Sequence, residues 1–299
     1  MNDFWIILTG ILVVASTGTL GCFLVLRKMT MVGDAISHAV LPGIVITYLL
    51  SGERNSFFMI IGAGLIGLLT TFLIEFLHKK GKVQEDASIG ITFTSFFALG
   101  VILISYFAGN VDLDQDCVLY GEIAYITLDP MLIGGMEYGP RAVWLLAVVF
   151  FIVVIVVTIG YRSLKVTTFD PSYAASIGIS ATLWHYILMS LVSLTTVASF
   201  ESVGAILVVA FLTVPPATAY LLTENLKRML LLSILFGVLA SVSGYYLAAW
   251  SNGSIAGAMA TASGVLFALV FIGKRIQTKY LNTQHKIPNN NIQMTNKLQ

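Results

Sequence analysis

The segment FWIILTGILVVASTGTLGCFLVL, from Phe4 to Leu26, is the first long apolar run of this chain. It contains no charged residue, and it is long enough to cross the hydrocarbon core of a membrane, which takes about 20 apolar residues in a helix. Charged residues make up only 10% of the 299 residues, against about 25% in soluble domains. The sequence therefore predicts an integral membrane protein. The formal net charge of +1 carries no information about partners, and we expect no nucleic-acid partner.

Nine apolar segments of this kind occur along the chain, and the second is shorter than most. Because backbone polar groups cannot stay unpaired in lipid and no alternating barrel pattern is present, we expect all of them to be helices. The prediction is an all-α polytopic membrane protein with eight or nine spans, in which segment 35–50 either crosses the membrane or re-enters it. The segments are Phe4 to Leu26, Ala35 to Leu50, Phe57 to Leu77, Ala87 to Phe107, Val143 to Tyr161, Ala181 to Ser199, Val203 to Leu222, Met229 to Trp250 and Ile255 to Ile272.

The basic residues separate between the two sides of the membrane in a nine-span arrangement. All of the 16 lysines and arginines except Arg54 and Arg141 fall on one side. The positive-inside rule then predicts an outer N-terminus and a cytoplasmic C-terminus. An even number of spans would spoil this separation, so the charge pattern favours keeping the short second segment as a span.

Asp34 and His38 form an Asp/His pair at helical spacing within the short second segment and its preceding turn. Residues four apart lie on the same face of a helix, where a carboxylate and an imidazole can hold a divalent metal ion or each other. Ionisable groups in membrane segments are costly and therefore point to function. Oxygen and nitrogen donors suit manganese, iron or zinc. The alternative is that the two side chains only hydrogen-bond each other or a neighbouring helix.

Two segments carry proline where a helix would otherwise continue. Pro42-Gly43 interrupts the second segment, and Pro215-Pro216 interrupts the seventh. Proline frees backbone carbonyls, which are tolerated where they face protein or a water-filled cavity, so these residues are candidates for shaping a transport pathway. Alternatively the prolines only kink their helices, since proline is more frequent in membrane helices than in soluble ones.

The cytoplasmic connection before the sixth segment contains the signals of a short helix. Asp170 reads as the N-cap, Pro171 as the first helical residue and Gly178 as the end. Such a helix could dock into a groove on a cytoplasmic partner. The alternative is an interfacial helix that lies against lipid.

Two other ionisable residues stand at the cytoplasmic ends of their spans. We expect Glu75 to snorkel to the surface or to pair with a nearby lysine. We expect His185 to lie in the membrane interface. Neither is a candidate site residue.

No phosphate-binding loop of the Gly-x-x-x-x-Gly-Lys-Ser/Thr type occurs in the sequence. If ATP drives this protein, another chain must bind it, so the chain is not expected to be an enzyme. A secondary, ion-coupled cation transporter is the main alternative, but it should have two similar inverted halves, and only one Gly-Asp-x-x-x-His segment is present. An intramembrane metalloenzyme would need three or more protein ligands, and the apolar segments of this sequence offer too few His, Asp or Glu residues for that.

Four stretches resemble, in order, the motifs of the ABC-3 family of metal-ion permeases, the membrane subunits of bacterial manganese, zinc and iron importers. The resemblance extends from about Phe4 to Gly273. The stretches are Leu24 to Gly43, Glu85 to Ile91, Phe169 to Gly178 and Val203 to Ala219.

The resemblance implies a homodimer of permeases in the bacterial cell membrane, two cytoplasmic ATP-binding subunits and an extracytoplasmic metal-binding protein. Asp34 and His38 would coordinate the transported ion, for which a two-fold dimer could supply four ligands. Phe169, Asp170, Pro171 and Gly178 would belong to the segment that couples ATP hydrolysis to gating. We expect residues 1–275 to form the permease domain and residues 276–299 a disordered cytoplasmic tail.

Overall fold

The computed structural model describes residues 2–51, 56–107, 123–133 and 136–285. Within these ranges nine helical segments are long and apolar enough to cross a membrane, and the expected all-α polytopic architecture is confirmed. The helices are α1 (Asn2–Leu26), α2 (Met31–Ala39), α3 (Leu41–Ser51), α4 (Ser56–Lys79), α5 (Glu85–Phe107), α7 (Arg141–Phe169), α8 (Pro171–Ser176), α9 (Ala181–Val203), α10 (Ala205–Leu222), α11 (Leu226–Ser251) and α12 (Ile255–His285), with the short 3₁₀ helix η1 (Ile123–Leu128).

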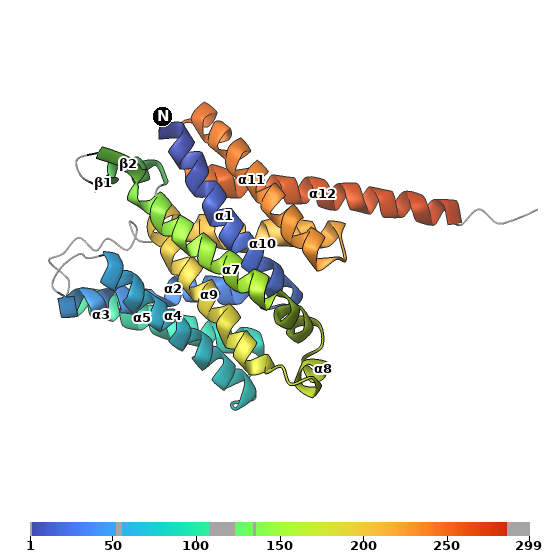
Figure 1. The fold of residues 1–299 in the computed structure, drawn as a ribbon, viewed down its shortest axis with the longest axis horizontal. Coiled ribbons are helices and arrows are strands. Elements are labelled where there is room, and N and C mark those ends of the chain that lie inside the picture. The colour runs from blue at the N-terminus through green and yellow to red at the C-terminus, as the bar shows by residue number, and fades with distance from the viewer. Residues whose placement is uncertain (1, 52–55, 108–122, 134–135, 286–299) are drawn as a thin grey trace, which may run out of the picture.

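The helices form two groups that share a central set. Helices α2 to α5 pack on one another on one side, and α10, α11 and α12 pack together on the other. Helices α1, α7 and α9 run between them, and α9 contacts α4 and α2 while α1 contacts α10 and α11. Figure 1 shows α8 at one end of the molecule and the N-terminus at the opposite end.

The short second segment consists of two helices in series rather than one. Together they make a candidate span of 21 residues, Met31–Ser51. The break falls at Val40, two residues before the expected position, and Pro42 lies in the first turn of α3. Proline is tolerated there because the N–H groups of a first turn have no partner within the helix. A Cβ on Gly43 would lie 2.5 Å from the carbonyl oxygen of Gly62, so this glycine permits close packing of α3 on α4.

The expected interruption at Pro215-Pro216 is wrong, because α10 continues through both prolines. Each proline lacks the N–H that would bond the carbonyl four residues earlier, which frees the carbonyl of Leu212 below Pro216. That carbonyl packs against α1, where a Cβ on Gly21 would lie 2.0 Å from the Leu212 oxygen. Close backbone contact between the two helices therefore accommodates the prolines without a break.

A small β-hairpin, which the sequence did not predict, precedes α7. Strands β1 (Pro130–Ile133) and β2 (Met136–Pro140) pair antiparallel. Trp144 of α7 donates from Nε1 to the carbonyl of Tyr138 at 3.1 Å. Gly139, at φ +91°, lies against the ring of Trp5 in α1. The hairpin is thus held by α1 and α7 at the end of the molecule opposite α8 (Figure 1).

Helix α12 runs on to His285, past the expected domain boundary at residue 275. No glycine or proline occurs between Lys274 and His285, so nothing in this stretch terminates the helix. The remainder of the expected tail, residues 286–299, lies outside the described residues.

Candidate functional site

Helix α2 is buried on every side except the stripe that carries the Asp/His pair. Six of its nine residues are buried, among them Val32 and Ile36, which belong to the main apolar core. The residues that are not buried are Met31, Asp34 and His38. The apolar residues therefore fix the orientation of α2, and the two ionisable side chains stand on the face that the folded chain leaves accessible.

The two side chains lie close enough to act on one ion. Nε2 of His38 is 3.6 Å from Oδ1 of Asp34, and the side chains are 34% and 36% exposed, respectively. This separation is an ion-pair contact, longer than an ordinary hydrogen bond. The His38 ring also lies beside Phe93 and Phe97 of α5, with centroid distances of 5.9 and 6.1 Å. The pair is thus walled on one side by aromatic rings and accessible on the other.

One chain supplies only part of a coordination shell at this place. In the described residues, no group of three or more His, Cys, Asp or Glu side chains is arranged to hold a metal ion. A further oxygen is available from the backbone, because Pro42 has no N–H to donate to the carbonyl of His38 four residues earlier. Asp34, His38 and that carbonyl are the local donors, and other ligands must come from water or from a second molecule.

The Pro42-Gly43 and Pro215-Pro216 positions lie in different helices, α3 and α10. Pro42 and Gly43 follow the Asp/His pair directly, whereas Pro215 and Pro216 are buried in α10. The contact between the two regions runs through Leu212, whose side chain fills the position that a Cβ on Gly33 would occupy. Gly33 precedes Asp34, so α10 supports the back of α2.

Helix α8 has the ends that its sequence predicts. Oδ1 of Asp170 accepts a hydrogen bond from the backbone N–H of Tyr173 at 2.9 Å, which caps the helix. Pro171 occupies the first turn, and Gly178 adopts φ +80° just after the last turn. A left-handed conformation of this kind favours glycine, so Gly178 fixes the direction in which the chain enters α9.

Three large apolar side chains in and beside α8 are exposed. Phe169, Tyr173 and Ile177, spaced four residues apart, are 57%, 56% and 47% exposed. Ala174 alone among the six residues of α8 is buried. These exposed apolar side chains lie at the end of the molecule where Figure 1 places α8.

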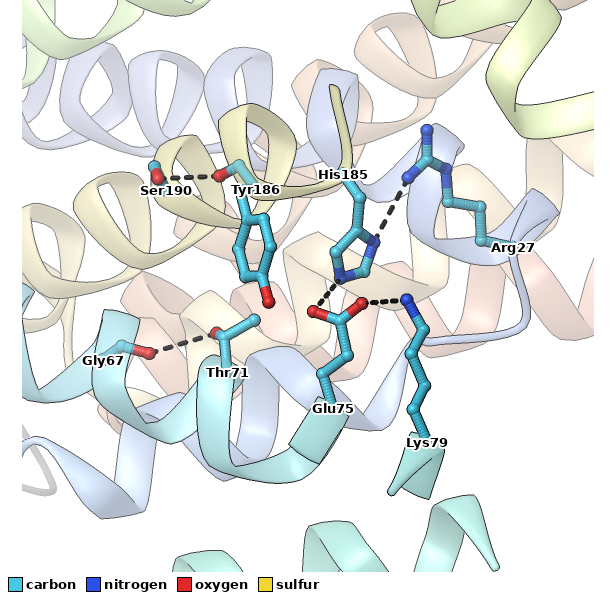
Figure 2. A network of polar contacts seen from close by, with 8 residues as sticks. All are labelled: Arg27, Gly67, Thr71, Glu75, Lys79, His185, Tyr186 and Ser190. Atoms are coloured by element: carbon cyan, nitrogen blue, oxygen red, sulfur yellow. Dashed lines mark hydrogen bonds and ion pairs between the residues drawn. The ribbon is translucent and has the colours of Figure 1, made fainter. Parts of the chain in front are cut away.

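A second polar cluster lies near this end, and the sequence did not predict it. Figure 2 shows Glu75 of α4 between Lys79 and His185, with Arg27 on the far side of His185. Glu75 forms an ion pair with Lys79, as expected, but its other oxygen faces Nε2 of His185 at 3.7 Å. Glu75 and His185 are only 11% and 15% exposed. Both side chains are therefore largely covered by the protein and belong to one network.

The cluster borders a cavity of about 510 Å³ between the ends of several helices. Burial lowers the pKa of the Arg27 guanidinium below its ordinary value. The signal that could have revealed the cluster is that Arg27, Glu75 and His185 all stand on the side assigned to the cytoplasm. The cavity is lined in part by Arg27, Glu75, His78, Glu85, Thr168 and His185.

Comparison with known families gives a match over almost the whole chain. A family model described as "ABC 3 transport family" matches residues 3–274. The manganese transport system membrane protein MntD of Bacillus subtilis is 50% identical over 284 residues, which cover 94% of this chain and 96% of that protein. The zinc transport system membrane protein TroD of Treponema pallidum is 45% identical over 267 residues, covering 89% and 72%.

A solved structure agrees with these matches. The structure described as PsaBC from Streptococcus pneumoniae in complex with Fab superposes with a TM-score of 0.74 at 33% identity. The superposition covers 89% of this chain and 90% of that chain. Sequence and fold therefore indicate the same relationship.

Proposed function

Because this chain belongs to the ABC 3 transport family, we propose that it is the membrane permease subunit of an ATP-driven importer for a divalent transition metal ion. The relatives named for manganese and zinc transport support this assignment, and iron is a third candidate ion. The chain is a transport subunit and not itself an enzyme, so ATP hydrolysis belongs to a separate subunit. The main structural support for a particular site is that Asp34 and His38 lie on the accessible face of α2.

In this proposal Asp34 and His38 bind the ion transiently on its path. A transport site must bind its ion well enough to admit it and weakly enough to release it, and two ligands from one chain meet that need. A second copy of the chain, related by a two-fold axis beside α2, would bring the total to four. The accessible stripe on an otherwise buried helix supports such an arrangement. Pro42 contributes by freeing the His38 carbonyl, and Gly43, Pro215 and Pro216 hold the neighbouring helices that shape the path.

The proposed contact with the ATP-binding subunits is the segment from Phe169 to Gly178. Its exposed residues Phe169, Tyr173 and Ile177 form an apolar face that a groove on a partner could accept. We assign this end of the bundle to the cytoplasm, with the N-terminus and the β-hairpin on the outer side, where an extracytoplasmic metal-binding protein would deliver the ion. The positive-inside rule supports that orientation. The permease domain then comprises about residues 1–275 in a bacterial cell membrane.

The test is reconstitution of the permease with its ATP-binding subunits and metal-binding protein in lipid vesicles. Uptake of Mn²⁺, Zn²⁺ and Fe²⁺ is measured in competition, with ATP and with a non-hydrolysable analogue. We expect uptake of at least one of these ions that requires hydrolysable ATP. Uptake by the permease alone, driven by an ion gradient, would instead support a secondary transporter.

A further inference from the structure

Arg27 occupies the tight connection between α1 and the helix that carries Asp34 and His38. Lys28 adopts φ +62°, and the N–H of Met29 bonds the carbonyl of Leu24 at 2.9 Å. The Val32 N–H in turn bonds the Met29 carbonyl at 3.3 Å. This hydrogen-bonded turn is a Schellman-type ending that leaves little freedom between the two helices. A displacement of Arg27 is therefore passed to the start of α2.

The guanidinium of Arg27 contacts both chain segments that flank α8. Its Nε donates to Oγ1 of Thr168, and its Nη2 to Oγ1 of Thr167, both at 3.1 Å. These threonines are in the last turn of α7. Nη1 lies 3.5 Å from Nδ1 of His185, in the first turns of α9. Because the planar guanidinium fork has fixed donor directions, three contacts to two segments set their relative position.

The contacts of His185 continue the network to α4. A guanidinium only donates, so Nδ1 of His185 is the acceptor, and the neutral imidazole then carries its hydrogen on Nε2. That nitrogen faces Oε2 of Glu75 at 3.7 Å, and neither atom has a hydrogen-bond partner among the described residues. An approach of about 1 Å would complete a buried hydrogen bond between them.

This network lies between the segments that flank α8 and the start of α2. Helix α8 packs on α7 and α9, the two elements that hold Thr167, Thr168 and His185. Motion of α8 must therefore pass through the segments that Arg27 holds. We propose that Arg27, with His185 and Glu75, is a positioning element that transmits displacement of α8 to α2 and so couples ATP hydrolysis to the Asp34/His38 site. This inference rests on the proposed function.

The test measures Mn²⁺ uptake and ATP hydrolysis in the same vesicles, with the permease reconstituted together with its ATP-binding subunits and metal-binding protein. The first variant is Arg27→Ala. The second is the near-isosteric pair Thr167→Val with Thr168→Val, which removes two acceptors of Arg27 and keeps the packing volume. Thr182→Val is the matched control, because Thr182 lines the same cavity but is not among the side-chain hydrogen-bond partners of Arg27 in the described part of the chain.

We expect both network variants to hydrolyse ATP and to import about fivefold less Mn²⁺ per ATP than the wild type, while the control stays at the wild-type ratio. Combining the three substitutions should lower the ratio no further than Arg27→Ala alone, because both variants remove the same contacts. If the threonine pair imports as much Mn²⁺ per ATP hydrolysed as the wild type, the inference is overturned. This holds also where uptake and hydrolysis fall in proportion. A wild-type complex without ATP-driven uptake would overturn the proposed function as well, so the two failures are distinguishable.

Discussion

Nε2 of His38 and Oδ1 of Asp34 lie 3.6 Å apart on the face of α2 that the rest of the chain leaves accessible. The opposite face of the same helix is core, with Val32, Ala35 and Ile36 at most 1% exposed. A pair held for stability would be expected inside that core, with its hydrogen bonds satisfied. The observed position instead suits side chains that must exchange water for a passing ion.

The first prediction concerns the stability of the pair. Partly exposed ion pairs contribute at most about 1 kcal/mol, so Asp34→Asn and His38→Ala should each leave the permease folded and close to wild-type stability. Thermal unfolding of the purified protein in detergent checks this. A loss as large as that caused by truncating the fully buried Phe23 would mean that the pair holds the fold together rather than the ion.

The second prediction concerns the contact between α1 and α10. In Gly21→Ala the new Cβ would lie 2.0 Å from the carbonyl oxygen of Leu212, so the two helices must separate. Overpacking of this kind costs about 1–3 kcal/mol or more. The matched control is Gly64→Ala in α4, where a Cβ meets nothing within 4 Å. We expect Gly21→Ala to unfold at a lower temperature than the wild type and Gly64→Ala to unfold at the wild-type temperature. Equal unfolding temperatures for the two variants would refute the close helix contact.

The third prediction concerns the cap of α8. Asp170→Ala removes the acceptor of the Tyr173 N–H and should destabilise the helix by about 1 kcal/mol. Asp170→Asn keeps an acceptor and is the matched control. Hydrogen exchange of the amides of residues 172–176 should accelerate in the alanine variant, and ATP-driven uptake should fall with it. If the asparagine variant is impaired as severely, the charge of Asp170 matters to the partner subunit and the capping account is insufficient.

The parts of this structure that the sequence predicts depend on local signals. The spans follow from apolar length, and the ends of α8 follow from Asp170, Pro171 and Gly178, whose backbone preferences act within one turn. The common face of Asp34 and His38 follows from their spacing alone.

The parts that were missed depend on partners far away in the sequence. Pro215 and Pro216 predict a break when α10 is considered alone, but Gly21 of α1 lets the freed carbonyl pack closely and the helix continues. Arg27 and His185 are separated by 158 positions. In the sequence, each residue is an isolated ionisable group near the membrane interface, and their contact is visible only in the folded structure. Packing of this kind is a tertiary property that no local pattern encodes.

If Asp34 and His38 bind the transported ion, their substitution must impair uptake by the reconstituted complex. ATP-driven Mn²⁺ uptake and ATP hydrolysis are measured for wild type, Asp34→Asn and His38→Ala. The matched control is His78→Ala, which removes an exposed imidazole that contacts the Val83 carbonyl. We expect uptake to fall at least about tenfold in both site variants, with ATP hydrolysis and folding retained, and normal transport by the control. Normal uptake by a stably folded His38→Ala permease would mean that His38 does not bind the ion.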